Sequence, residues 1–335
     1  MQTKHLTIPE AALLLQNKEL VAFPTETVYG LGADATSDEA VAKIFAAKGR
    51  PNDNPLIVHI GTLEQLDSVV SEIPDVAKKL MDAFWPGPLT VILPKQTGLS
   101  MEVTAGLPSV GVRMPSHPVA LALLQAANLP IAAPSANVSG RPSPTTAQHV
   151  LEDLDGRIAG IVDGGGAEIG LESTVIDCTV EPPVILRPGG VTKEAIEAII
   201  GLVNTDEVRK NSDFSPKSPG MKYKHYAPRA PMTIVKGSEA FFQKVIDEAR
   251  EQGKRVGILA TEENKEKYEA DVILICGTQQ DLASIATKLY DALRSFDQYD
   301  IDVIYSESFS EVGLGKAIYD RLLKASGYRV MEEKE

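Results

Sequence analysis

The chain has 335 residues, 43% of them hydrophobic, and a net charge of −13. This length suits two domains of ordinary size with buried cores, and the acidic balance argues against a surface built mainly to hold nucleic acid. There is neither an unbroken apolar run long enough to span a membrane nor an apolar signal core in the first residues, MQTKHLTIPE, so we expect a cytoplasmic protein with no membrane partner.

Short apolar runs alternate with helical patterns over about the first two hundred residues. Helices are predicted at residues 38–48, 118–127 and 145–154. Strands are predicted at residues 20–24, 55–60, 89–93, 109–114, 130–134, 158–162, 174–178 and 184–187. Some of these strands are separated by helices and others only by turns. We therefore predict an α/β domain on a twisted mixed sheet, with parallel and antiparallel strands.

The pattern lapses between residues 204 and 228, where three prolines and several turn formers occur. Strands at 232–235, 255–260, 271–276 and 302–306 then alternate with helices at 239–251, 281–296 and 315–326, which is typical of a small Rossmann-like unit. We predict three parts: a first domain over residues 1–205, a linker over 206–229 and a Rossmann-like C-terminal domain over 230–335. The linker has six basic and three acidic residues, whereas both flanking parts are acidic.

Two glycines and two cations stand out after the first apolar strand, which ends at Pro24. Gly30 and Gly32 predict a tight turn or a close approach of the backbone to a ligand. The following helix ends at Lys48, and Arg50 follows after a single glycine. This arrangement suits a C-cap whose cations complement the helix dipole, and it equally suits a pair of cations that binds an anion.

Two predicted strands carry a single strongly polar side chain each. His59 lies in the apolar run PLIVHI, where a histidine is more often a core residue than a ligand. The strand SVGVRM alternates, so that its apolar side chains face one side while Arg113 faces the other, open side next to Gly111. An arginine in that position suits two-pronged binding of a carboxylate, although it would also suit the surface of a strand.

Several long motifs, in order, are similar to those of the threonylcarbamoyl-AMP synthase family, the YrdC-like proteins. They are PTETVYGLGADA, KGRPNDNPLIVHI, WPGPLTVIL, SVGVRMPSH, APSANVSGRPSPT, ESTVID and LRPGG. The segment SPGMKYKHYAP and the α/β unit after it resemble the longer, two-domain branch of that family. The resemblance implies that residues 1–205 form a YrdC-like catalytic domain.

The resemblance implies a nucleotidyltransferase that makes threonylcarbamoyl-AMP for threonylcarbamoyladenosine formation in tRNA. In that reaction the amine of L-threonine takes up bicarbonate or CO2, and the carbamate attacks the α-phosphate of ATP with release of pyrophosphate. Mg2+ is expected with the ATP, and a tRNA threonylcarbamoyl transferase is the expected downstream partner. No stable nucleic-acid complex is expected. The sequence has no Walker A loop, so ATP would bind by another geometry.

The resemblance also implies site residues, although it assigns no catalytic residue and no metal ligand. The threonine pocket would be formed by Thr27, His59, Arg113, the backbone near Ala133, and Ser173. The ATP site would be formed by Lys48, Arg50, Asn54, Ser109, Ser135, Asn137, Ser143 and Arg187. Without the resemblance, the hydroxyl and amide residues in this set would be explained as ordinary turn residues.

The linker motif adds two aromatic candidates, Tyr223 and Tyr226, among cations. They suit stacking on adenine, and we expect residues 221–228 to form a lid over the ATP end of the site. The alternative is a strap that only connects the two domains.

Two other functions compete with the enzyme. A module that binds double-stranded RNA or tRNA without chemistry is disfavoured by the acidic balance. A maturation factor that uses carbamoyl phosphate would need zinc-type cysteine clusters and further domains, but the chain has only two cysteines.

Overall fold

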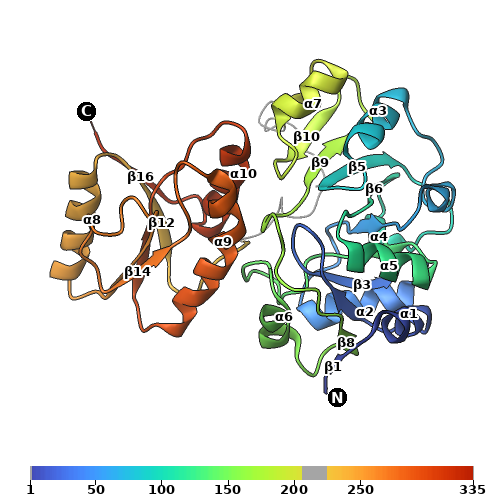
Figure 1. Cartoon of the computed structure of the whole chain (residues 1–335), viewed down its shortest axis with the longest axis horizontal. Coiled ribbons are helices and arrows are strands. Elements are labelled where there is room, and N and C mark those ends of the chain that lie inside the picture. The colour runs from blue at the N-terminus through green and yellow to red at the C-terminus, as the bar shows by residue number, and fades with distance from the viewer. Residues whose placement is uncertain (1, 206–224, 335) are drawn as a thin grey trace. The chain divides into compact units, whose positions relative to one another are not determined.

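The computed structural model describes residues 2–205 and 225–334, which form two compact α/β units (Figure 1). The first unit holds most of the residues up to 205. The second holds residues 225–334 together with two short segments, Gly140–Pro142 and Ile169–Leu171. Within these described ranges, no helix is both long and apolar enough to cross a membrane.

The first unit is built on a mixed sheet with the strand order β1-β8-β2-β3-β7-β4-β6-β5-β9-β10-β11. Pairs such as β4–β6 and β5–β9 are parallel, whereas β2–β3 and β5–β6 are antiparallel. The predicted mixed sheet is therefore confirmed. The strands are β1 (Lys4–His5), β2 (Val21–Phe23), β3 (Gly30–Asp34), β4 (Ile57–His59), β5 (Leu89–Pro94), β6 (Ser109–Arg113), β7 (Ile131–Ala132), β8 (Gly160–Ile161), β9 (Thr174–Asp177), β10 (Val184–Arg187) and β11 (Asn204–Thr205).

The helices of the first unit begin and end at residues with the expected capping chemistry. Ser37 precedes α2, and its side chain accepts a hydrogen bond from the Ala40 backbone N–H. Gly49 ends the same helix in the left-handed conformation, with φ 61°. The helices are α1 (Ile8–Gln16), α2 (Asp38–Lys48), η1 (Leu63–Ser68), α3 (Asp75–Phe84), α4 (Met101–Thr104), α5 (Pro118–Ala127), α6 (Ala147–Leu154) and α7 (Lys193–Ile200).

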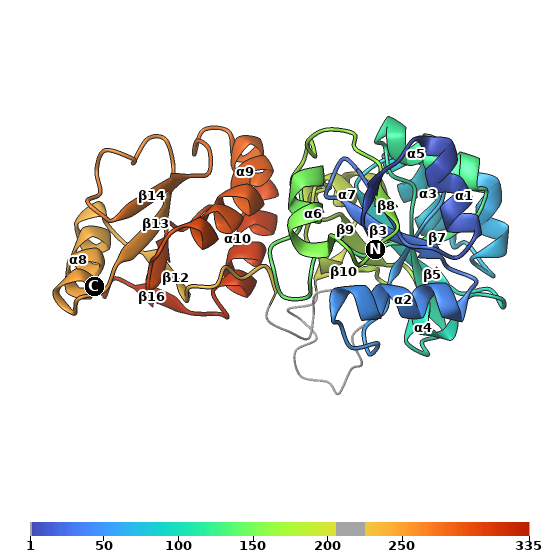
Figure 2. The ribbon, with the colours of Figure 1, turned by 90° about the horizontal axis from the view of Figure 1, so that it is seen from below.

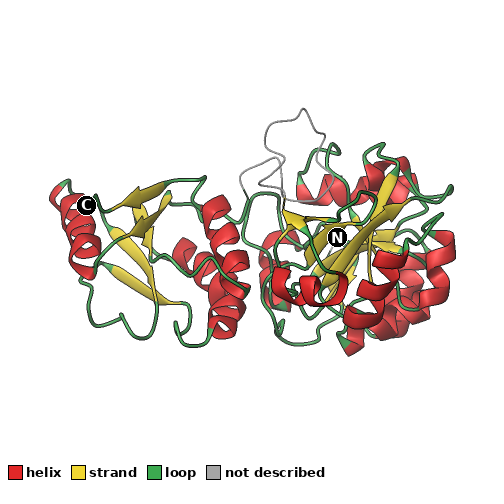
Figure 3. Ribbon diagram, turned by 90° about the horizontal axis from the view of Figure 1, so that it is seen from above, coloured by secondary structure: helices red, strands yellow, loops and turns green. Residues whose placement is uncertain are grey.

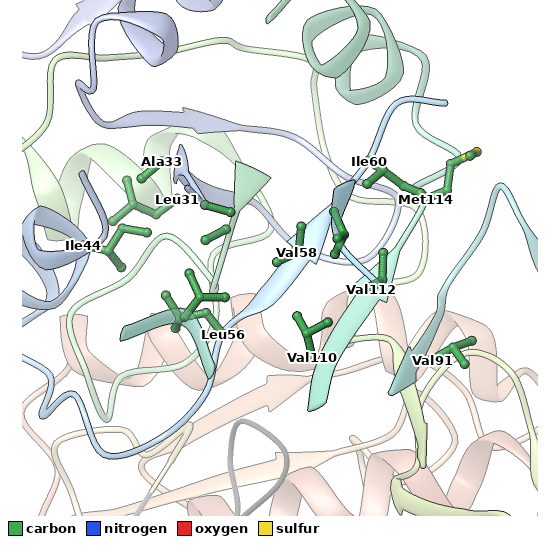
Figure 4. Close-up of a cluster of buried hydrophobic side chains, with 14 of the residues drawn as sticks. Leu31, Ala33, Ile44, Leu56, Val58, Ile60, Val91, Val110, Val112 and Met114 are labelled. Carbon is green, nitrogen blue, oxygen red and sulfur yellow. The ribbon is translucent and has the colours of Figure 1, made fainter. Parts of the chain in front are cut away.

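Most of the core of the first unit lies on one face of its central strands. Val58, Val91, Val110 and Val112 come from three neighbouring strands and belong to one cluster of buried hydrophobic side chains (Figure 4). Side chains alternate along a strand, so the residues next to these valines must face the other side of the sheet. His59 and Arg113 are among them.

The predicted turn at Gly30 and Gly32 is wrong, because both residues lie in strand β3, which pairs with β2 and β7. Gly32 serves a close approach of side chains from those two neighbours. A Cβ at Gly32 would lie 2.9 Å from Phe23 and 3.0 Å from Ile131. Helices α1, α3 and α7 are also additions to the predicted set.

The second unit is a parallel sheet with the strand order β14-β13-β15-β12-β16, which agrees with the predicted Rossmann-like unit and adds strand β16 to it. Helix α8 covers one face of the sheet, and α9 and α10 lie together on the other (Figures 2 and 3). Its elements are β12 (Met232–Lys236), α8 (Glu239–Glu251), β13 (Val256–Ala260), β14 (Val272–Ile275), α9 (Leu282–Ser295), η3 (Phe296–Gln298), β15 (Val303–Ser306), α10 (Leu314–Ala325) and β16 (Val330–Glu332).

Candidate active site

A row of polar side chains crosses the sheet of the first unit on the face opposite the main core. His59 is paired with Arg113 in the register of β4 and β6. The register of β5 with β6, continued by one residue, places Thr90 opposite Arg113. Thr90 is in turn paired with Val175, and Val175 with Arg187. Paired residues face the same side of a sheet, so strand register, together with an irregularity of β10 between Ile185 and Arg187, brings His59, Arg113 and Arg187 into one line.

Next to this polar row the same face carries a small apolar floor. Ile57, Ile92 and Val175 belong to a separate cluster of buried hydrophobic side chains. A cleft opens over this floor beside Gly111, where a side chain would contact Thr90. The cleft is lined by Pro55, Leu56, Ile57, Thr90, Ile92, Ser109, Gly111 and Val175.

Arg113 is buried, not on an open strand face, with 4% of its surface exposed. Its Nη1 donates to Thr27 Oγ1 at 2.8 Å and its Nε donates to the Gly87 carbonyl at 3.2 Å. Its Nη2 lies 2.7 Å from Glu26 Oε1. Thr27 and Glu26 come from the loop after β2, so this loop folds over the end of β6 and removes Arg113 from solvent. The expectation of an open face is corrected by that contact.

His59 is also buried, and its Nδ1 has no hydrogen-bond partner. Its ring makes an edge-to-face contact with Phe23, with ring centres 6.2 Å apart. Burial, together with the charge of Arg113, lowers the pKa of His59 to about 3. The imidazole is therefore neutral near pH 7 and keeps an unused ring nitrogen beside Arg113.

Ser173, which is predicted to line the threonine pocket, contacts Arg187, which is predicted to bind ATP. Its Oγ lies 2.7 Å from Thr90 Oγ1. Arg187 donates from Nη2 to Ser173 Oγ at 3.1 Å and from Nε to the Ser173 carbonyl at 3.0 Å. The two predicted groups therefore meet at the start of β9.

Lys48 lies at the end of α2, and its ammonium is held by the loop after β7. The Nζ atom donates to the carbonyls of Ser135 at 2.5 Å and Asn137 at 2.7 Å. Ser135 Oγ donates to Asn137 Oδ1 at 2.5 Å. The C-cap explanation of this helix end is correct for Gly49, and Lys48 in addition joins two of the residues predicted to bind ATP.

The remaining predicted residues of the first unit make contacts of several kinds. Arg50 Nη2 donates to the Asn54 carbonyl at 3.2 Å. The Ala133 N–H donates to the Ile57 carbonyl at 2.9 Å, which fixes β7 against β4. Ser109 lines the cleft. Ser143 is buried, and its hydroxyl donates to Glu172 at 2.5 Å.

The two linker tyrosines are not both described. Tyr223 lies outside the described residues, as does most of the expected lid. Tyr226 belongs to the second unit, where its buried ring lies 5.2 Å from the ring of Tyr290 and 5.7 Å from the guanidinium of Arg321.

Three contacts in this site involve residues that the sequence did not single out as ligands. Glu26 pairs with Arg113, Thr90 contacts Ser173, and Glu172 accepts a hydrogen bond from Ser143. Glu26 and Glu172 stand inside the motifs PTET and ESTVID, so motif position could have indicated them. Thr90 lies in an apolar run and gives no such signal.

Family models and curated proteins match this chain along nearly its whole length. A model described as telomere recombination matches residues 13–189, and one described as the C-terminal domain of threonylcarbamoyl-AMP synthase matches residues 191–327. The threonylcarbamoyl-AMP synthase of Bacillus subtilis is 56% identical over 332 residues, which cover 99% of this chain and 96% of that protein. The Pyrococcus abyssi enzyme is 49% identical over 327 residues, which cover 96% and 94%.

A solved structure agrees with these matches. The crystal structure of Pyrococcus abyssi Sua5 complexed with L-threonine superposes with a TM-score of 0.92 and 47% sequence identity. The match covers 99% of this chain and 98% of that one, so both units are included. The chain belongs to the threonylcarbamoyl-AMP synthase family.

Proposed function

We propose that this chain makes threonylcarbamoyl-AMP from L-threonine, bicarbonate or CO2, and ATP, with release of pyrophosphate. The observation that carries the proposal is the buried polar row of His59, Arg113 and Arg187 on one face of the sheet. The row combines two fixed guanidinium groups with a neutral imidazole. Such a site can hold a carboxylate and a phosphate close together, which this reaction requires.

The amino-acid end of the row is the threonine site in this proposal. Arg113 binds the threonine carboxylate, because it retains N–H donors beyond those given to Thr27 and Gly87. His59 offers its unused ring nitrogen to the substrate. Ser173 and the backbone near Ala133 complete the pocket.

The other end of the site takes ATP. Lys48, Arg50 and Arg187 supply positive charge, and Asn54, Ser109, Ser135, Asn137 and Ser143 supply polar contacts. The sequence predicts Tyr223 and Tyr226 as aromatic partners of the nucleotide, and for Tyr226, whose ring is buried against Tyr290 in the second unit, this stays a prediction. The carbamate oxygen of the modified threonine attacks the α-phosphorus, the bond from that phosphorus to the bridging oxygen of pyrophosphate breaks, and the cations stabilise the charge on both products. The protein contributes mainly position and charge to this step.

Mg2+ enters the proposal only with the phosphates of ATP, which Mg2+ usually accompanies. Residues 2–205 and 225–334 contain no group of three acidic, histidine or cysteine side chains that could hold a metal ion. The Asp163 carboxylate accepts hydrogen bonds from Tyr29 and the Gly165 backbone. We therefore derive no step through a protein-bound metal.

The product determines the partner. A threonylcarbamoyl-adenylate is a mixed anhydride that water destroys, so a tRNA threonylcarbamoyl transferase has to consume it nearby. Because the product is consumed in tRNA modification, we place the reaction in the cytoplasm with that process.

The proposal is tested by incubating the protein with ATP, Mg2+, labelled bicarbonate and one amino acid at a time. A labelled adenylate should form with L-threonine and should be absent when either ATP or the amino acid is omitted. Label that enters a product without threonine, or the appearance of ADP in place of the adenylate and pyrophosphate, would refute it.

A further inference from the structure

Glu26 is the acidic neighbour of Arg113, and its side chain is only 3% exposed. Its Oε1 lies 2.7 Å from Arg113 Nη2, and both Glu26 oxygens are shielded from solvent. Buried polar atoms normally have hydrogen-bond partners, because an unpaired one costs free energy. Glu26, Arg113 and His59 together hold four buried side-chain atoms for which the described residues supply no well-aligned hydrogen-bond partner.

Glu26 and Arg113 form an adjacent pair of opposite charges. Burial is the largest single influence and raises the pKa of Glu26, but the charge and close contact of Arg113 and nearby backbone N–H groups together lower that pKa by more, so the carboxylate stays ionised near pH 7. His59 adds no charge there, because its pKa is about 3. A free amino acid carries the complementary pair, a carboxylate and an ammonium group that are both attached to its α-carbon.

The Glu26–Arg113 pair determines how a substrate carboxylate can bind to Arg113. A carboxylate placed on Arg113 by itself would bring two negative charges against one guanidinium, at the distance of an ion pair. Repulsion at such a distance is strong in a buried site. An ammonium group bound next to Glu26 removes that repulsion, because each of the four charged groups then has an opposite partner.

We propose that Glu26 is the binding partner of the amino group of the amino acid held at Arg113, and so selects substrates that carry a free α-amine. This inference rests on the proposed function, since it takes Arg113 as the carboxylate site. It adds a specificity-determining residue on the loop that follows β2. The competing explanation is that Glu26 only neutralises Arg113, in which case its removal should affect all carboxylate ligands alike.

The test measures binding without turnover, by isothermal titration calorimetry in the absence of ATP. The two ligands are L-threonine and (R)-3-hydroxybutanoate, which is threonine without its amino group. The proteins are the unaltered chain, Glu26→Gln, Glu26→Asp and a control, Glu64→Gln, whose carboxyl is exposed at the surface.

The unaltered chain and Glu64→Gln should bind L-threonine at least about tenfold more tightly than the analogue, because a charge-assisted hydrogen bond is lost with the amine. In Glu26→Gln that preference should shrink severalfold or vanish, while binding of the analogue stays equal or tightens. Glu26→Asp keeps the charge and should keep part of the preference.

An equal change in the affinity for both ligands in Glu26→Gln, in either direction, would overturn the inference and leave Glu26 as a counter-ion. Should Glu26→Gln fail to fold, the unaltered chain still decides: equal affinity for the two ligands overturns the inference. Failure of the unaltered chain to bind threonine at all would instead refute the proposed function, and the inference with it.

Discussion

Arg113 and His59 are held next to each other by strand register, and each is buried in a state that costs free energy unless something nearby compensates it. Thr27, Gly87 and Glu26 compensate the charge of Arg113. The neutral form of His59 avoids a second positive charge. The sequence predicted both residues as ligands from a family motif, but it could not give this division of charge, which depends on the fold of the loop after β2.

Arg113 should control threonine affinity and leave ATP affinity nearly unchanged. Arg113→Ala removes a charge-assisted pair worth roughly 1.5–3 kcal/mol, so threonine should bind on the order of ten- to a hundredfold more weakly. Lys48→Ala and Arg50→Ala should show the reverse pattern, with weaker ATP binding. Calorimetric titration of each variant with each substrate separates these effects. Unchanged threonine affinity in Arg113→Ala would mean that the carboxylate binds elsewhere.

His59 should make the folded chain less stable in mild acid. Its pKa is about 3 in the folded chain, against an ordinary value of 6.5. Below pH 6.5 the unfolded chain therefore binds a proton that the folded chain refuses, so the free energy of unfolding falls as the pH drops from 6.5 toward 3. By pH 5 this amounts to roughly 1–2 kcal/mol for the one residue.

The measurement is urea unfolding between pH 7 and pH 5, with His59→Gln as the comparison because glutamine does not titrate. The variant should lose less stability over that range than the unaltered chain does. Parallel losses in both proteins would show that His59 is not buried in its neutral form.

At the scale of elements, strand β3 shows where glycine fixes the packing. Gly32→Ala should lower the free energy of unfolding by about 1–3 kcal/mol, as overpacking does, because the new Cβ would meet Phe23 and Ile131 at 2.9 and 3.0 Å. Gly30→Ala is the matched control on the same strand, since its Cβ would meet its nearest neighbours at 3.4 Å. Urea midpoints of the two variants test this, and a Gly32→Ala midpoint equal to that of Gly30→Ala would contradict it.

The elements that could be predicted from sequence are those with an apolar run or a regular period. The runs at residues 89–93 and 109–114 became β5 and β6 almost unchanged. Strand β3 could not be predicted in this way, because its sequence GLGAD suggests a turn and its pairing with β2 and β7 is a tertiary contact. Helix α3 had a usable signal, since Ala77, Leu80 and Met81 recur at helical spacing and are buried.

At the scale of the whole molecule, charge limits the partners. The chain carries 46 acidic against 33 basic residues, so long-range attraction to a nucleic-acid backbone is weak. We expect no stable complex with tRNA at physiological salt, which a filter-binding titration over a range of salt concentrations would measure. Tight binding that weakens steeply with salt would contradict this expectation and favour direct handling of tRNA by the chain.

The central claim is that a carbamate of threonine attacks the α-phosphate of ATP. The most direct measurement follows pyrophosphate release from ATP by the purified chain, with threonine, bicarbonate and Mg2+ each omitted in turn from a buffer freed of CO2. The account predicts rapid release only in the complete mixture, with release restored when the missing component is added back. Equal release without threonine or without bicarbonate, or release of orthophosphate and ADP in the complete mixture, would contradict it.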